Sequence, residues 1–286
     1  MTMKKKSDED RIEKLIRRAL KEDIGEGDHS TLACIDRQSV GVAVLKIKED
    51  CVVAGINIAE RIFKYVEPGV EFKAYIKDGE QAHKGDAAFR VKGKIHTILS
   101  CERLVLNCMQ RMSGIATLTR IYVNELQGYK SILLDTRKTT PNFRILEKEA
   151  VKMGGGSNYR FGLYDMIMLK DNHIDYAGGI EKAIKRVAGY KAEKHLKLPV
   201  IIEARKIDDI KEIMGVGKVD RIMLDNFSPD QIKDAMKLIN GQYETEASGG
   251  ITPENIKEYA ATGVTYISSG ALIHQAKSVD MSLKAE

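Results

Sequence analysis

The second half of the chain repeats one pattern: a short apolar run, a polar or glycine-rich segment, and then a stretch of helical periodicity. The apolar runs begin 20 to 34 residues apart, near residues 132, 166, 200, 222, 245 and 265. This spacing is typical of βα units, in which parallel strands form a sheet that helices cover. Because only six or seven strands can be counted, we predict an α/β fold with an open, incomplete barrel of about seven strands in this half.

The first half lacks this alternation, and we predict a separate α+β domain there. Apolar residues between 8 and 22 share one helical face, and a second helix is predicted over 58–66. Strands are predicted over 40–47, 51–55, 70–76, 87–91 and 94–98. A long helix over 100–125, broken or closely packed at Gly114, joins the two halves. The predicted domains are residues 1–112 with the return of 274–286, and residues 113–273.

Polar and glycine residues follow each apolar run of the second half. In an α/β barrel, the loops after the carboxyl ends of the strands meet at one mouth, where the chemistry takes place. Here these loops carry cations after the first two runs, carboxylates at the next two, and serine and glycine at the last two. The residues are Arg137, Lys138, Lys170, Glu203, Asp225, Ser248, Gly249, Gly250, Ser268, Ser269 and Gly270. Together they predict a site for a polyanion and a metal ion.

The cations of this set suit an acidic ligand. Arg137 offers a planar fork of donors that fits a carboxylate or phosphate, and Lys138 adds a point charge beside it. A second arginine, Arg160, follows glycines 154–156, and glycine lets the backbone approach a ligand closely. Three roles are open for Lys170: a Schiff-base nucleophile, a cation for an anionic substrate, or a structural partner of Asp171 or a neighbouring carboxylate.

The remaining residues suit a metal ion and a phosphate group. Glu203 and Asp225 fit Mg²⁺, which proteins commonly hold with one or two carboxylates plus the phosphates of a substrate. Arg205 faces the same side of its strand as Glu203 and is a candidate for a structural ion pair with it. The two Ser-Gly segments match the phosphate site that the late loops of a barrel form.

Composition excludes several classes of partner. The net charge of +5 suits an anionic small molecule, but it is too small and too scattered for nucleic acid. The four cysteines show no C-x-x-C spacing, which argues against structural zinc and for reduced thiols. No run approaches the roughly 18 apolar residues that a membrane span needs, and no signal peptide is recognisable. We expect a cytoplasmic protein without nucleic-acid or membrane partners.

Five longer segments form an ordered set of motifs: Glu22–Asp28, Asp135–Pro141, Met168–His173, Met223–Phe227 and Glu246–Ile251. In these motifs, and almost from end to end, the chain resembles the quinolinate phosphoribosyltransferase family. The resemblance implies an amino-terminal α/β sandwich followed by an open seven-stranded α/β barrel. It also implies a homodimer in which the sandwich of one subunit covers the barrel mouth of the other. The implied reaction converts quinolinate and phosphoribosyl pyrophosphate, with Mg²⁺, into nicotinate mononucleotide, pyrophosphate and carbon dioxide.

The resemblance also implies a role for each matching position. Arg103, on the helix between the domains, would reach across the dimer interface to bind quinolinate. The other positions implied for quinolinate are Arg137, Lys138, Tyr159, Arg160 and Lys170. Those implied for the metal and the ribose are Glu203 and Asp225, and those for the 5′-phosphate are Ser248–Gly250 and Ser268–Gly270. The implied catalytic residues are Lys138, Lys170, Glu203 and Asp225.

Two positions depart from the family pattern: Tyr159 stands where histidine is common, and Ile201 where glutamate is frequent. A tyrosine donates one hydrogen bond but lacks the partial positive charge of an imidazole, so we expect changed quinolinate affinity and an intact reaction. The alternatives are a divergent homologue that uses another pyridine acid such as nicotinate, a Schiff-base aldolase built on Lys170, and a phosphate sensor without activity. His29 and His173 are expected to be structural.

Overall fold

The computed structural model describes the backbone of residues 3–286 and the side chains from Asp8 onward. Contacts divide the chain into two compact units. The first comprises the residues up to Arg120, Thr139–Gly155 and Leu272–Glu286, and the second comprises Ile121–Lys138 and Gly156–Ala271. The first unit thus includes 139–155, whose helix contacts the amino-terminal helix. The domain bounds drawn from the sequence stay a prediction.

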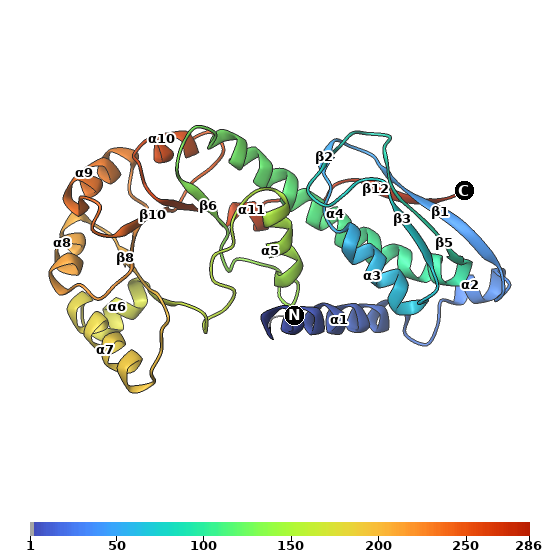
Figure 1. Cartoon of the computed structure of the whole chain (residues 1–286), viewed down its shortest axis with the longest axis horizontal. Coiled ribbons are helices and arrows are strands. Elements are labelled where there is room, and N and C mark those ends of the chain that lie inside the picture. The colour runs from blue at the N-terminus through green and yellow to red at the C-terminus, as the bar shows by residue number, and fades with distance from the viewer. Residues whose placement is uncertain (1–2) are drawn as a thin grey trace. The chain divides into compact units, whose positions relative to one another are not determined.

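The first unit is built on a four-stranded antiparallel sheet in the order β12-β1-β5-β3 (Figure 1). Because β12 pairs with β1, the end of the chain returns to this unit. A separate pair of short strands, β2 and β4, is also antiparallel. The strands are β1 (Val40–Ile47), β2 (Cys51–Val52), β3 (Glu71–Ala74), β4 (Gln81–Ala82), β5 (Ala87–Lys94) and β12 (Met281–Ala285).

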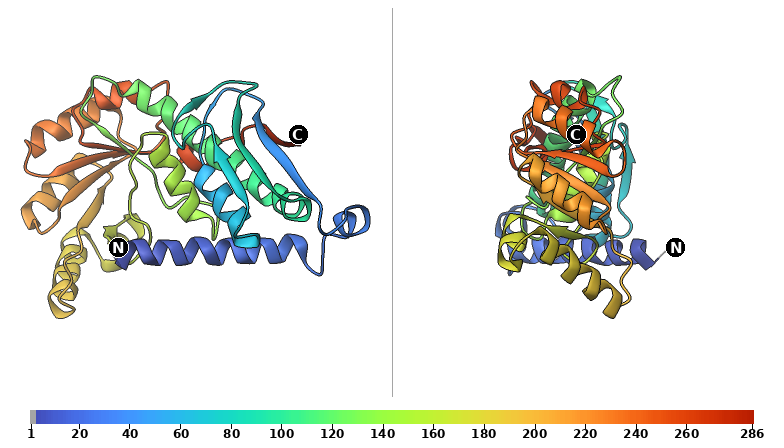
Figure 2. Two further views of the ribbon diagram at one scale, coloured as in Figure 1. Left: turned by 45° about the vertical axis from the view of Figure 1, so that its right-hand side comes forward. Right: turned by 90° about the vertical axis from the view of Figure 1, so that its left-hand side faces the viewer.

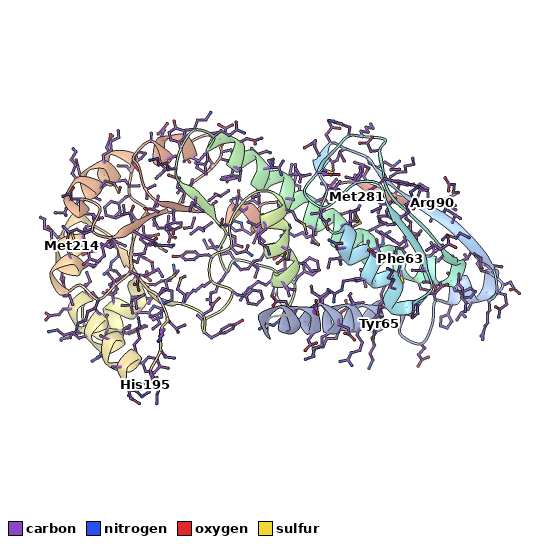
Figure 3. The ribbon with its side chains drawn as sticks, in the orientation of Figure 1. Phe63, Tyr65, Arg90, His195, Met214 and Met281 are labelled. Atoms are coloured by element: carbon purple, nitrogen blue, oxygen red, sulfur yellow. The ribbon has the colours of Figure 1, made fainter. Side chains whose placement is uncertain are left out.

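Helices pack with this sheet around an aromatic core. Phe63 of α3 is labelled in Figure 3. Its ring contacts those of Phe72 and Phe89 of the sheet, with ring centroids 6.3 and 6.2 Å away. All three rings are apolar, so their burial favours packing of α3 on the sheet. The helices are α1 (Met3–Ile24), α2 (His29–Cys34), α3 (Ile56–Val66), α5 (Arg144–Met153), α11 (Ala271–His274) and α4 (Ile95–Glu125), whose last residues belong to the second unit.

The long helix α4 differs from its prediction at one end and agrees with it in the middle. The strand predicted over 94–98 is wrong, since α4 already begins at Ile95. Ile98, Cys101 and Val105 are buried at helical spacing, so the packing of a helical face overrides the local strand preference. Close packing at Gly114 is confirmed, because a Cβ atom there would lie 1.8 Å from the carbonyl oxygen of Lys277.

The second unit contains a six-stranded parallel sheet in the order β6-β11-β10-β9-β8-β7 (Figure 1). The strands are β6 (Ile132–Leu134), β7 (Ile167–Leu169), β8 (Val200–Ala204), β9 (Arg221–Asp225), β10 (Glu244–Ser248) and β11 (Tyr266–Ser268). The helices between them are α6 (Asp171–Ala177), α7 (Ile180–Glu193), α8 (Ile207–Val216), α9 (Pro229–Ile239) and α10 (Ile256–Ala260) (Figure 2).

The predicted open barrel is confirmed by this strand order. Strands β6 and β7 follow one another along the chain but lie at opposite ends of the sheet, so the barrel stays open between them. About seven strands were predicted; besides the six strands of the sheet, the described residues form one isolated parallel bridge, between Leu134 and Ser157. The glycines just before Ser157 fit this outcome, because glycine weakens a strand.

The inner face of the sheet carries a small apolar core. Leu134, Tyr159, Met168, Ile201 and Met223 form one buried cluster. Ile201, the second departure from the family pattern, is therefore a packing residue of this interior. None of the described helices has the length and apolar character that crossing a membrane requires.

Candidate active site

The register of the parallel strands places several predicted site residues at one level. Ser248 pairs with Asp225 on one side and with Ser268 on the other. Ser268 in turn pairs with Leu134, the last residue of β6. Since all these strands run in the same direction, a predicted carboxylate and the starts of both Ser-Gly segments line the same edge of the sheet.

A lysine and a buried glutamate face each other on the next two strands. Lys170 follows β7 and its Nζ atom lies 3.5 Å from Oε2 of Glu203 on β8. Burial raises the pKa of the Glu203 carboxyl, and the negative charge of Asp225 raises that pKa further. Of the roles left open for Lys170, the structural pairing with a carboxylate is formed, and its partner is Glu203 on the neighbouring strand rather than Asp171.

Two residues near this pair have structural contacts. The backbone N–H of Lys170 donates to Nδ1 of His173 at 3.1 Å, which closes the first turn of α6. This contact agrees with the structural role expected for His173. Arg205 was expected to pair with Glu203, but its guanidinium donates to both oxygens of Asp175, at 2.8 and 3.1 Å. The expected pair of Arg205 with Glu203 is therefore wrong, and Glu203 pairs with Lys170.

The loop after β9 is held by an asparagine to which the sequence analysis gave no role. Asn226 has a positive φ of 57°, and its side-chain N–H donates to Asp225 at 2.7 Å. Its backbone N–H donates to the carbonyl of Ser248 at 2.8 Å. A Cβ atom at Gly249 would lie 2.2 Å from Oδ1 of Asn226. The only available signal was the position of Asn226 in a motif, directly after the predicted carboxylate.

The late loops are shaped by hydrogen bonds to the main chain. Ser269 is buried; its N–H donates to the carbonyl of Leu134 at 3.0 Å and its hydroxyl to the carbonyl of Ile251 at 3.3 Å. The carbonyl of Gly250 accepts a hydrogen bond from the side chain of Asn255 at 3.0 Å. These contacts give the two Ser-Gly segments a defined shape beside Asp225.

The positive charges of two arginines act on each other in the second unit. Arg160 is buried, and its Nη1 atom donates to the carbonyl of Met166 at 3.2 Å. Burial lowers the pKa of Arg160, and the positive charge of Arg137 lowers that pKa further. Arg137 and Lys138 are exposed in the loop after β6. Because two guanidinium groups repel each other, an anion that bridges them would stabilise the pair.

Tyr159 points into the interior and takes part in a polar network. Its hydroxyl donates to Oε2 of the buried Glu246 at 2.5 Å, and its backbone N–H donates to Asp135 at 2.8 Å. Burial raises the pKa of Tyr159, which keeps the hydroxyl protonated as a donor. The hydroxyl of Tyr159, which was predicted to donate its hydrogen bond to quinolinate, thus donates it to Glu246. Glu246 itself was missed, although it opens one of the motifs.

Arg103 lies in the other unit. It is an exposed residue of α4, in the part of the helix that belongs to the first unit. The role of Arg103 in a quinolinate site stays a prediction.

Comparisons with known proteins extend this description. Residues 28–113 match the family model of the quinolinate phosphoribosyl transferase N-terminal domain, and residues 115–284 match that of the C-terminal domain. A rice protein, "Nicotinate-nucleotide pyrophosphorylase [carboxylating], chloroplastic", is 44% identical over 96% of this chain and 78% of its own length. A Bacillus subtilis protein, "Probable nicotinate-nucleotide pyrophosphorylase [carboxylating]", is 41% identical over 95% of this chain and 92% of its own length.

Solved structures show the same likeness. A crystal structure of NadC from Streptococcus pyogenes matches with a TM-score of 0.89 and 39% identity, over 96% of this chain and 97% of that chain. A nicotinate-nucleotide pyrophosphorylase from Francisella tularensis matches with a TM-score of 0.89 and 34% identity, over 97% and 96%. Both domain models match in sequence order, and together they span most of the chain. The chain therefore belongs to the quinolinate phosphoribosyltransferase family.

Proposed function

We propose that this protein transfers a phosphoribosyl group from phosphoribosyl pyrophosphate to quinolinate and removes one carboxyl group of the pyridine. The products are nicotinate mononucleotide, pyrophosphate and carbon dioxide, which is a step of NAD biosynthesis. Family membership supports the reaction type. The observation that carries the assignment is that Asp225 and the starts of both Ser-Gly segments line one edge of the sheet, which also holds the Lys170–Glu203 pair.

The chemistry of quinolinate explains why several cations are needed. Its two adjacent carboxylates repel each other, and a pocket that takes them out of water must offset that cost with paired donors. Arg137 and Arg160 bind carboxylates by parallel hydrogen bonds, while Lys138 and Lys170 add mobile positive charges. Lys170 is tethered near Glu203, which orients its ammonium group before substrate arrives.

A magnesium ion fits the two carboxylates at the strand ends. The charge of Asp225 raises the pKa of Glu203, so a cation near both groups would remove an existing repulsion. Among the described residues no group of three or more potential ligand side chains occurs, so further ligands would come from the pyrophosphate of the substrate. When bound, Mg²⁺ would neutralise charge on the departing pyrophosphate.

The Ser-Gly segments fit the 5′-phosphate of the sugar donor. Ser248 and Ser268 are paired in register, and Gly249 and Gly250 both have positive φ, of 99° and 64°. This backbone turns away from the strand without a side chain in the way, so that a phosphate can approach it closely. Asp225 lies at the same level on the neighbouring strand, where a carboxylate favours positive charge developing on the ribose.

The second half of the reaction requires little acid–base machinery. After transfer, the pyridine nitrogen carries a positive charge next to C2. When the C2 carboxylate leaves as carbon dioxide, the electron pair stays on C2, is stabilised by that charge, and takes up a proton. The protein contributes orientation and fixed charge.

The working form in this proposal is a homodimer in which Arg103 of one subunit completes the site of the other. Subunits carrying Arg103→Ala and subunits carrying Lys170→Ala are each expected to be weakly active. A random mixture should regain about a quarter of wild-type activity, because half of the dimers are mixed and each holds one intact site. No recovery despite demonstrated subunit exchange would contradict this arrangement.

A cytoplasmic location is also part of the proposal. Cys51, Cys101 and Cys108 are buried and none of the four cysteines is in a disulfide, which fits a reducing compartment. Burial raises the pKa of Cys101 to about 12, so this thiol resists oxidation. Fractionation of cells that express a tagged chain tests the location; enrichment in an organelle or membrane fraction would contradict it.

The decisive experiment measures pyrophosphate release with quinolinate and, separately, with nicotinate, each with phosphoribosyl pyrophosphate and Mg²⁺. Release with quinolinate, accompanied by one carbon dioxide per turnover, is the expected result. Lys170→Ala should abolish most of it, whereas Lys237→Ala, which removes an exposed lysine paired with Asp234, should leave it unchanged. Release with nicotinate alone would assign the chain to the divergent alternative instead.

A further inference from the structure

Beneath the strand ends of the second unit lies a buried carboxylate surrounded by side-chain donors. Glu246 of β10 is fully buried. Its Oε1 atom accepts a hydrogen bond from the Ser268 hydroxyl at 2.6 Å. Its Oε2 atom accepts from the Tyr159 hydroxyl at 2.5 Å and from Nη1 of Arg221 at 3.2 Å. These donors come from three different segments, so one carboxylate connects parts of the sheet that are remote in sequence.

Arg221 is held in place from its other side. Its guanidinium lies over the ring of Tyr266, 3.5 Å from the ring centroid, and 5.5 Å from that of Tyr159. It also donates to Glu244 at 3.2 Å. The positive charge of Arg221 faces the negative charge of Glu246, so the two buried charges of this network compensate each other.

Two of the donors belong to the proposed substrate site or adjoin one of its residues in the chain. Ser268 is the last residue of β11 and begins the second Ser-Gly segment. Tyr159 precedes Arg160, and its backbone N–H donates to Asp135, which directly follows β6 and precedes the loop with Arg137. The carboxylate of Glu246 thus contacts both Ser268, in the proposed phosphate segment, and Tyr159, beside the proposed acid-binding arginines.

Stability alone gives little reason for such a group. Burial raises the pKa of Glu246, whereas the hydrogen bonds from Ser268 and Tyr159 and the charge of Arg221 act in the opposite direction. A buried ion pair of this kind is often no more stabilising than an apolar replacement of the same volume. What an apolar replacement could not do is set the direction of the Tyr159 and Ser268 hydroxyls.

We infer that Glu246 is a positioning residue that aligns the quinolinate side and the phosphate side of the site through Tyr159 and Ser268. This inference rests on the proposed function. Its consequence is that Tyr159, which lies on the quinolinate side, also influences the affinity for phosphoribosyl pyrophosphate. If the two sides were built independently, a change at Tyr159 would be felt by quinolinate only.

The test compares two tyrosines that differ in their partners. Tyr159→Phe removes the hydroxyl that Glu246 accepts and keeps the ring. Tyr266→Phe is the matched control, because its hydroxyl donates to Glu244 at 3.1 Å and its ring also lies against Arg221. We expect Tyr159→Phe to raise the KM for both substrates by about tenfold, the loss typical of one hydrogen bond to a buried charged group. Tyr266→Phe should leave both KM values within about twofold.

A double-mutant cycle shows whether the effect passes through Glu246. In a Glu246→Ala background, adding Tyr159→Phe should change the KM for phosphoribosyl pyrophosphate by less than about twofold, because the connection is already lost. Glu246→Gln should restore much of the affinity, since its carbonyl can still accept from Tyr159 while its amide donates to the Ser268 oxygen. A Tyr159→Phe effect confined to quinolinate, or one that persists undiminished in Glu246→Ala, would overturn the inference.

Binding measurements separate this inference from the proposed function. Calorimetry of phosphoribosyl pyrophosphate binding, without quinolinate, compares wild type with Tyr159→Phe and needs no turnover. Weaker binding by about tenfold in the variant supports the positioning role. Equal binding overturns that role, whether or not the wild type releases pyrophosphate from quinolinate. Melting temperatures of each variant show which proteins are folded, and Tyr159→Phe, the mildest change, carries the test if Glu246→Ala does not fold.

Discussion

Each unit of the molecule buries one glutamate beside an arginine, and the two pairs differ in what surrounds them. In the first unit, both oxygens of Glu147 are used: Oε1 accepts from Arg111 at 3.0 and 3.1 Å and from the Thr140 hydroxyl at 2.9 Å, and Oε2 accepts from the Thr140 backbone N–H at 2.8 Å. Arg111 also donates to the carbonyls of Ile273 and Ala276, at 2.8 and 2.7 Å.

The pair in the second unit has a different set of partners. Glu246 accepts two of its hydrogen bonds from hydroxyl groups, those of Tyr159 and Ser268. A hydroxyl can rotate and act as donor or acceptor, but a backbone N–H and a guanidinium only donate. The Glu147 pair therefore clamps main chain and serves the fold of its unit. The Glu246 pair aligns side chains and, in our proposal, serves the site.

The largest expected effect is that of Glu147→Gln on stability. Either orientation of the new amide would direct an N–H toward the Thr140 N–H or the Arg111 guanidinium, so a buried donor is left unpaired. We expect a loss of about 3–5 kcal/mol in the free energy of unfolding, measured by urea denaturation. Glu149→Ala, two residues away in a surface pair with Lys152, is the control and should change it by less than about 1 kcal/mol. Equal losses would show that Glu147 is not a clamp.

The next effect concerns the main chain at the mouth. Gly249 has a φ of 99°, and a Cβ atom there would overlap with Asn226, so Gly249→Ala must shift the loop that follows β10. We expect a loss of about 1–3 kcal/mol in the free energy of unfolding and a higher KM for phosphoribosyl pyrophosphate. At Gly250 the φ is 64° and a Cβ atom meets nothing within 4 Å. Gly250→Ala should therefore destabilise less, and the reverse order would contradict the proposed loop geometry.

Glu246→Gln should have a smaller effect on stability than the same change at Glu147. Its amide can donate to Ser268, whose hydroxyl rotates to accept, while the carbonyl keeps the hydrogen bonds from Tyr159 and Arg221. The loss should be about 1 kcal/mol, read from the same denaturation curves. A loss as large as that of Glu147→Gln would remove the distinction between the two pairs.

The smallest effect is a pH dependence of the stability, caused by Glu203 at the strand ends of the second unit. Because the pKa of Glu203 is raised in the folded protein, the folded state keeps this proton to higher pH than the unfolded chain. The stability linked to it is present below about pH 4.5, the ordinary value, and is lost as the pH rises through the raised pKa. Without Mg²⁺, the melting temperature of wild type should therefore fall relative to that of Glu203→Gln as the pH rises above that value. Asp225→Asn lowers the pKa of Glu203 and should narrow this pH range. Parallel curves for wild type and Glu203→Gln would show that Glu203 is not perturbed.

The position of many candidate residues at the strand ends was predictable because its signals are local. Lys170, Glu203, Asp225 and the two Ser-Gly segments all stand at the ends of apolar runs, and parallel strands bring their carboxyl ends to one edge in any barrel order. The open α/β barrel followed from the spacing of the same runs. The strand predicted over 94–98 was wrong because the conformation there is not set by a local signal. Residues 95–98 form the start of the long helix α4, whose buried face packs in the first unit.

The sequence by itself determined the fold class, the family and the chemical types at the strand ends, because these depend on short-range periodicity and on motifs. Only the tertiary structure decided that Tyr159 turns inward to Glu246, that Arg205 pairs with Asp175, and that Asn226 packs against Gly249. Tyr159 and Glu246 are 87 residues apart in the chain. They meet because Glu246 lies on β10, which only β11 separates from β6, and the segment with Tyr159 runs beside β6. The partner of a buried carboxylate is set by which strands are neighbours, and no local pattern in the chain contains that order.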